Sequence, residues 1–172
     1  MTLKNHSLVY SPVGGAGEIG MNMYIYGFKS QNKVSYILVD AGVSFPKVDT
    51  EPGVDLIFPN PKLILDNLSD LEGIFITHAH EDHLGAIGFI ASKIDCKIYC
   101  RKFTAEIVKD KLNKVNVSNK RLVTVKEWPF EVKLKNASVS FFPTTHSVPE
   151  ASFLIMKSKF GIVLHTGDFK ID

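Results

Sequence analysis

The sequence predicts an α/β fold for this chain of 172 residues. Runs typical of strands outnumber runs typical of helices, and the helical runs fall between the central strands. Hydrophobic residues make up 45% of the sequence, which is ample for the core of one domain. This pattern is typical of a sheet covered by helices on its outer face. A chain so rich in strands usually needs a second sheet on the inner face.

The first half of the chain predicts strands on either side of a glycine-rich turn. We expect strands over 8–13, 21–28 and 34–40, with the turn Gly14-Gly15-Ala16-Gly17-Glu18-Ile19-Gly20 after the first and a hairpin connection at 29–33. A long loop follows, broken by Pro46, Pro52 and Pro59. A short helix is then predicted over 61–68, because Pro61 is well suited to a first helical position.

The second half alternates strands and helices and then becomes mostly β. A buried strand is predicted over 73–77, a helix over 82–92, a strand over 97–100 and an amphipathic helix over 103–112. Five further strands are expected over 122–125, 132–134, 139–143, 151–157 and 162–166.

Composition excludes several classes of protein. The net charge is +2, so no broad cationic face points to nucleic acid. We find no signal-peptide pattern and no apolar run near the ~20 residues that cross a bilayer, which predicts a cytoplasmic chain without a membrane partner. Cys96 and Cys100 have no second pair, so free thiols are favoured over a zinc knuckle.

The run His78-Ala79-His80-Glu81-Asp82-His83 follows directly after a predicted strand and contains four side chains that can bind a metal ion. Three imidazoles and a carboxylate in one loop form a mixture that suits Zn²⁺. The loop holds more ligands than one ordinary zinc ion needs, which suggests a binuclear site. The alternative is a solvated polar loop in which the histidines fall together by chance.

Two more candidate ligands each follow a predicted strand: His146 and Asp168. Residues at successive strand ends converge at one edge of an open α/β sheet, so we expect both to join the histidine loop. Alone, His146 would be read as an ordinary surface or core histidine and Asp168 as a turn residue after Gly167. His165 is expected to pack behind the site rather than bind metal.

The glycine turn also matches a dinucleotide-binding pattern. Gly15-x-Gly17-x-x-Gly20 has the required spacing, and Asp40 lies where a ribose-binding acid would be. That reading requires a helix after the turn, whereas residues 21–28 are aromatic and predict a strand. We therefore favour a tight turn that lets strands approach the metal loop.

Taken together, these motifs resemble a known family. The order His78-x-His80-x-Asp82-His83, then His146, then Asp168 is similar to the signature of the metallo-β-lactamase superfamily, and Asp40 is similar to its first motif. Within that superfamily, the chain resembles the β-CASP nucleases and among them bacterial ribonuclease J. Four segments in the same order carry this resemblance: 14–23, 77–86, 145–150 and 163–172.

The resemblance implies an αββα sandwich of which the chain holds the N-terminal portion, mostly one sheet with flanking helices. It implies two Zn²⁺ ions, although Mn²⁺ could also occupy such a site. His78, His80 and His146 would hold one ion, Asp82 and His83 the other, and Asp168 both, while Asp40 would brace the loop. Asp82 and Asp168 are the expected catalytic residues, and Ser147 and Lys170 are weaker candidates for contacts with a substrate phosphate.

The implied function is zinc-dependent hydrolysis of single-stranded RNA, both exonucleolytic and endonucleolytic. Residues 1–172 would form the N-terminal part of the lactamase domain, without its remainder, the β-CASP domain or a last histidine ligand. Ala151 departs from the serine common in the family. Two alternatives stay open. One is a small-molecule hydrolase of the same superfamily, such as a thioesterase or lactonase. The other is a non-catalytic fragment that exposes the inner face of its sheet and needs a complementary chain. A homo-oligomer is also open.

Overall fold

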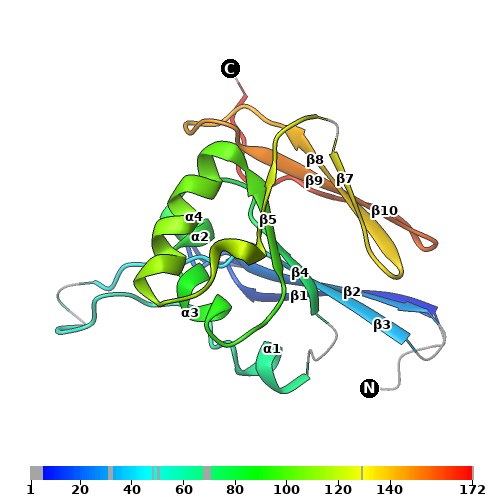
Figure 1. The fold of residues 1–172 in the computed structure, drawn as a ribbon. Helices are drawn as coiled ribbons and strands as arrows, with labels where there is room; N and C mark the ends of the chain where they lie inside the picture. Colours follow the sequence, from blue (N-terminus) through cyan, green and yellow to red (C-terminus); the bar gives the residue numbers. More distant parts are fainter. Residues whose placement is uncertain are drawn as a thin grey trace.

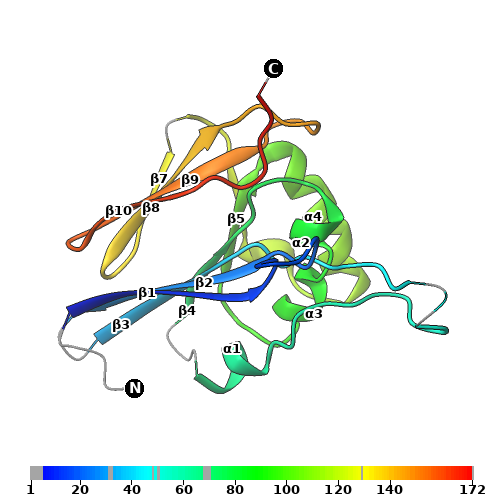
Figure 2. The ribbon, with the colours of Figure 1, turned by 180° about the vertical axis from the view of Figure 1, so that it is seen from behind.

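Two sheets packed face to face form the centre of the molecule, and helices cover the outer face of the larger sheet (Figures 1 and 2). The computed structural model describes residues 6–30, 33–47, 49, 51–67, 71–128 and 130–171. The expected α/β architecture is confirmed, with both sheets of the sandwich present.

The larger sheet has six strands in the order β1-β2-β3-β4-β5-β6. These are β1 (His6–Gly14), β2 (Met23–Ser30), β3 (Lys33–Val39), β4 (Leu71–Phe75), β5 (Lys97–Arg101) and β6 (Leu122–Val125). The pairs from β3 to β6 are parallel, and each parallel pair requires a crossover connection. The helices lie in those crossovers: α1 (Lys62–Asn67), α2 (Glu81–Leu84), α3 (Ile87–Ala91) and α4 (Lys102–Lys114), followed by the 3₁₀ helix η1 (Asn119–Arg121).

The smaller sheet is entirely antiparallel, in the order β10-β9-β8-β7. Its strands are β7 (Phe130–Lys133), β8 (Ala137–Pro143), β9 (Ser152–Ser158) and β10 (Gly161–His165). These four strands correspond to the strands expected over 132–134, 139–143, 151–157 and 162–166, and they form the second sheet expected on the inner face. Residues 130–165 form consecutive hairpins, which need no crossover and so stack on the first sheet as one unit.

Alternation along the central strands produces two cores. On β4, Ile74 packs toward the helices, while its neighbour Phe75 packs toward the second sheet. The second core includes Phe28, Phe141 and Leu154, all essentially buried. The inner face of the large sheet is therefore covered, and the expectation that a fragment would expose it is wrong.

The structure alters two local expectations. The helix predicted over 82–92 is split into α2 and α3, because Ala86 N donates to Ala41 O at 2.8 Å instead of to a carbonyl within the helix. The glycine turn leads into strand β2, so the helix that dinucleotide binding requires is absent at this position. The predicted helix over 61–68 matches α1, and Leu68 lies outside the described residues. No helix in the described ranges is long and apolar enough to span a membrane.

Replacement of Phe75 tests the contact between the sheets. Phe75 stacks on Tyr99 with ring centroids 4.8 Å apart and also contacts Phe141. We expect Phe75→Ala to lower the free energy of unfolding by about 3–5 kcal/mol, because it removes a ring and leaves a cavity. Urea denaturation measures the change. The control Ile162→Ala, at a position 70% exposed, should stay within about 0.5 kcal/mol. Equal effects of the two substitutions would contradict this account of the inner core.

Candidate metal centre

The candidate site is built on a buried carboxylate, Asp40, at the end of β3. Asp40 is fully buried and has φ = +61°, an unusual backbone conformation for a residue with a side chain. Its Oδ1 accepts a hydrogen bond from Thr77 N at 2.8 Å, and its Oδ2 accepts from Thr77 Oγ1 at 2.9 Å. Oδ2 also lies 2.8 Å from His83 Nδ1. The end of β3 is thereby tied to both ends of the histidine loop.

Backbone hydrogen bonds hold the histidine loop against residues 41–43. Ala41 N donates to His83 O at 2.7 Å, and Val43 N donates to Glu81 O at 3.1 Å. Gly42 lies between them, where an added Cβ would stand 1.7 Å from the carbonyl oxygen of Asp82. Asn22, which follows the glycine turn, donates its N–H to the same oxygen at 2.9 Å. The glycine turn therefore serves the close approach of strands to the loop.

Three histidines and one aspartate form the first ligand group. His78 Nε2 and His146 Nε2 each lie 3.1 Å from His80 Nδ1. Ligand atoms of these histidines and of Asp168 all lie within 4.8 Å of one another. The proton of Thr77 Oγ1 goes to Asp40, so this oxygen accepts from His78 Nδ1 at 3.0 Å. His78 Nε2 is then unprotonated and faces the site.

Asp82, His83 and Asp168 form the second group, again with ligand atoms within 4.8 Å. Because His83 Nδ1 donates to Asp40, the neutral form of the ring presents an unprotonated Nε2 to the site. That nitrogen lies 3.3 Å from Asp168 Oδ1 and 3.7 Å from Asp82 Oδ2. Lone pairs and carboxylate oxygens thus face one another, a donor set that suits a divalent cation. The residues fit the metal that the fold implies.

Asp168 joins the two groups. One carboxylate oxygen, Oδ1, faces His83, and the other, Oδ2, lies 3.7 Å from His146 Nε2. The side chain is 45% exposed, so the centre opens to solvent on this side. A carboxylate with one oxygen toward each group can bridge two cations.

The electrostatics of the site match this arrangement. Burial, together with the nearby His83, lowers the pKa of His78 to about 3, which keeps this ring neutral. Burial opposes a charge on His83, but the carboxylates of Asp40, Asp168 and Asp82 raise its pKa. Burial would likewise raise the pKa of Asp40, yet the His83 ring and the Thr77 N–H hold it below the usual value. The second group therefore lies in a field that attracts positive charge.

Comparison with known proteins identifies the family. A model of the beta-lactamase superfamily domain matches residues 35–171, most of the chain. The chain belongs to this superfamily. The sequence-based recognition of the metallo-β-lactamase type is thereby confirmed.

Two relatives from this superfamily carry the name Ribonuclease J 2. The protein of Staphylococcus epidermidis (strain RP62A) is 36% identical over 170 residues, which are 98% of this chain and 29% of that protein. The protein of Staphylococcus aureus (strain NCTC 8325) is 35% identical over the same coverage. The chain therefore spans under a third of the length of these relatives.

Two solved structures share the superfamily fold. A protein of unknown function from Enterococcus faecalis V583 gives a TM-score of 0.63 at 18% identity, over 95% of this chain and 44% of that one. The chemotaxis sensor ODP, described as a peroxy diiron species, gives 0.53 at 17% identity, over 90% and 56%. At these identities the likeness concerns the fold alone.

The structure brings together the six predicted ligands and the predicted brace Asp40. Of the weaker candidates, Ser147 Oγ lies 3.4 Å from His80 Nε2, whereas Lys170 has its backbone N–H bound to Thr145 O. His165 is outside both ligand groups and lies 2.9 Å from the Tyr26 hydroxyl, in agreement with a packing role. Both cysteines are free, and burial raises the pKa of the Cys100 thiol to about 12.

The residues that orient the candidate metal ligands through hydrogen bonds were not identified from the sequence. Asn22 Nδ2 lies 3.0 Å from His83 Nε2 and 3.3 Å from Asp82 Oδ2, and Tyr24 donates its hydroxyl to Asn22 Oδ1 at 2.7 Å. Thr77 orients His78 as described above. The only available signal was position, since Asn22 follows the glycine turn and Thr77 precedes His78.

Asp40→Asn tests the brace. The amide keeps the shape of the side chain but removes the charge that holds His83 Nδ1, so we expect Zn²⁺ affinity to fall about 10–100-fold with the fold retained. Calorimetric titration with Zn²⁺ and circular dichroism measure the two quantities. Asp95→Asn is the matched control, because its side chain is 96% exposed. Unchanged affinity in Asp40→Asn would show that Asp40 does not act on the ligands.

Proposed function

We propose that this chain forms the metal-holding part of a ribonuclease that hydrolyses phosphodiester bonds in single-stranded RNA. The proposal rests on the position of Asp168, whose two carboxylate oxygens each face one of the two ligand groups. The similarity to proteins named Ribonuclease J 2 supports RNA as the substrate. We propose that cleavage is both exonucleolytic and endonucleolytic.

In this proposal His78, His80 and His146 would hold one Zn²⁺, Asp82 and His83 would hold the other, and Asp168 would serve as a ligand in both groups. Manganese is the alternative ion, since the oxygen and imidazole ligands accept it too. Such a pair supplies Lewis acidity for a phosphoryl oxygen and lowers the pKa of water toward neutrality. The chain's own contribution is to fix the ligands. Thr77 and Asp40 set which nitrogen of His78 and His83 is unprotonated, and Asn22 positions Asp82.

An aromatic wall beside the second ligand group favours RNA over a small acyl substrate. A cavity of about 250 Å³ is shared by His83 and Asp168 and by Tyr10, Tyr24 and Tyr26. Tyr10 lies on the edge strand β1 with its ring centroid 5.2 Å from that of Tyr26, and it is 53% exposed. Exposed aromatic rings offer stacking faces to unpaired bases. A base stacked on Tyr10 would occupy the cavity that Asp168 also lines.

We further propose that additional polypeptide, from the same or a complementary chain, completes the site. The relatives are more than three times longer than the stretch that matches. In the described part of the chain, β10 and the residues after it expose apolar side chains at Ile162, Leu164, Phe169 and Ile171. Residues 1–172 are then the N-terminal part of the lactamase domain, and self-association is a second way to cover this surface. The free thiols agree with a cytoplasmic location.

Metal loading and RNA cleavage test the proposal directly. Purified protein should bind two Zn²⁺ per chain, and the loaded protein together with the remaining polypeptide should cleave an end-labelled, unstructured RNA; a chelator should abolish cleavage. Asp168→Asn should reduce the stoichiometry and lower the rate at least about 100-fold, because it removes the shared ligand. Metal analysis and gel electrophoresis provide the readouts.

Several outcomes discriminate between the alternatives. Cleavage of a thioester or lactone with intact RNA would support a small-molecule hydrolase. Binding of two ions without any hydrolysis, followed by activity when the remaining polypeptide is added, would support a fragment that needs a complementary chain. Absence of metal binding by a folded protein would refute the proposal.

Tyr10→Ala tests the aromatic wall. Loss of the stacking face should raise KM for the RNA about 5- to 100-fold. Hydrolysis of bis(p-nitrophenyl) phosphate, which has no base, should change less than about twofold. Tyr10→Phe is the matched control and should retain the RNA value, because the ring remains. Equal loss on both substrates would indicate a structural effect instead of base stacking.

A further inference from the structure

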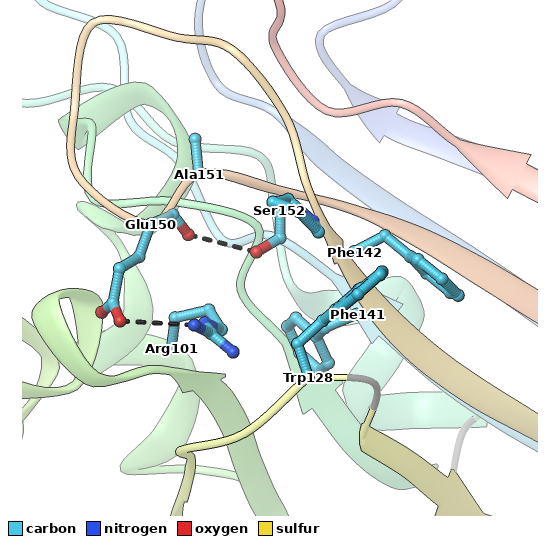
Figure 3. Close-up of a pocket in the computed structure, with 8 residues that line it drawn as sticks. Arg101, Trp128, Phe141, Phe142, Glu150, Ala151 and Ser152 are labelled. Atoms are coloured by element: carbon cyan, nitrogen blue, oxygen red, sulfur yellow. Dashed lines mark hydrogen bonds and ion pairs between the residues drawn. The ribbon is translucent and has the colours of Figure 1, made fainter.

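A second cavity lies where the loop between β8 and β9 begins and ends (Figure 3). Its volume is about 130 Å³. The walls come from the ends of β8 and β9, from the β5–α4 junction and from the connection between β6 and β7. The lining residues are Arg101, Trp128, Phe141, Phe142, Pro143, Glu150, Ala151 and Ser152. None of them belongs to the two ligand groups.

The apolar part of this cavity suits one flat ring. Phe141 is buried at its base, and Phe142 meets Trp128 edge to face with centroids 5.6 Å apart. Trp128 itself is 54% exposed, so part of its ring is open to solvent where it lines the cavity. A cavity of this order, about 150 Å³, holds a benzene-sized molecule in another protein. A single six-membered ring fits in the cavity, whereas a fused pair of rings would extend out of it.

One charged pair supplies the polar edge of the cavity. Arg101 Nη2 lies 3.4 Å from Glu150 Oε1, and Nη1 donates to Glu127 O at 3.3 Å. A guanidinium has five N–H donors, and these two long contacts, the ones within the described ranges, leave capacity for a further acceptor. Glu150 offers acceptor oxygens beside it. Because the two charges offset each other, the edge favours a neutral group with an adjacent donor and acceptor over a phosphate.

Glu150 is held in place from several directions. It has φ = +58°, a strained conformation for glutamate, and its Oε2 accepts from Phe103 N at 2.6 Å, at the start of α4. Its carbonyl accepts from the Ser152 hydroxyl at 3.1 Å. The loop closes just there, where Thr144 N donates to Ala151 O at 3.0 Å. The ends of the loop thus line the cavity, while its body carries His146 to the candidate metal centre.

We propose that this cavity binds a pyrimidine base of the RNA substrate, with the ring between Trp128 and Phe141 and the base edge on Arg101 and Glu150. The identity of the ligand rests on the proposed function. Uracil and cytosine each present a ring nitrogen beside an exocyclic group, one able to donate and the other to accept in each base. Glu150 lies at the end of the loop that carries His146, so one loop contributes both to this cavity and to the candidate metal centre.

Trp128 makes the test selective, because it is the only tryptophan in the chain. Its fluorescence, excited at the red edge where the five tyrosines do not absorb, reports on this cavity alone. The full 172-residue protein is titrated without added metal with UMP, CMP, AMP and ribose 5-phosphate. We expect saturable quenching by UMP and CMP, binding of AMP at least about tenfold weaker, and no saturable response to ribose 5-phosphate.

Two substitutions locate the polar contact. Arg101→Gln should weaken UMP binding about tenfold, because it removes a charged hydrogen-bond donor. Lys126→Gln, two residues from Trp128, removes the same charge from an exposed position outside the lining and should change binding less than about twofold. The wild-type comparison of nucleotides needs no variant, so it decides the matter even if Arg101→Gln fails to fold.

Any of four results would overturn the inference: no saturable quenching by UMP or CMP, an equal response to ribose 5-phosphate, AMP binding as tight as UMP binding, or equal loss of UMP affinity in the two variants. Metal uptake is measured on the same preparations, and RNA cleavage after the remaining polypeptide has been added to them. Cleavage without UMP binding refutes this inference alone, whereas UMP binding without metal uptake or cleavage refutes the proposed nuclease alone.

Discussion

The candidate centre depends on one buried interaction, the carboxylate of Asp40 between Thr77 and His83. Burial of a carboxylate without partners would be costly, and here the hydrogen bonds that offset the cost also orient the ligands. Through Thr77 the same group fixes His78, and through His83 it fixes the second ligand group. The position has a backbone conformation unusual for a residue with a side chain, so the surrounding strands must enforce it.

Much of the architecture followed from periodicity. The strand predicted over 122–125 coincides with β6, and the predicted bounds of α4 and β5 lie within two residues of the observed ones at each end. In these segments the pattern of buried side chains and the intrinsic propensity of the residues favour the same secondary structure. The break between α2 and α3 could not be foreseen. It arises from a hydrogen bond between Ala86 and Ala41, which are distant in sequence. The four strands of the second sheet were each expected from the sequence, but their order β10-β9-β8-β7 was not, because local pattern does not determine which strands pair.

The candidate site was more predictable than the surroundings that support it. Histidines and aspartates at strand ends have few reasons to fall in such an order, so His146 and Asp168 could be joined to the loop before their positions were known. Asn22 and Tyr24 have no such signal, because amide and hydroxyl side chains occur everywhere. The same holds for the cavity at Trp128: its lining comes from four separate segments, and no pattern in any one of them indicates a pocket.

Asp168 has a consequence for the order in which the molecule matures. Both ligand groups require it, and it follows β10, the outermost strand of the second sheet. A nascent chain that has been synthesised only as far as the histidine loop contains part of each ligand group. Neither ligand group is complete until the second sheet has formed and packed on the first. Binding of the cations would then require completed tertiary assembly, so metal uptake would follow the packing of the second sheet on the first.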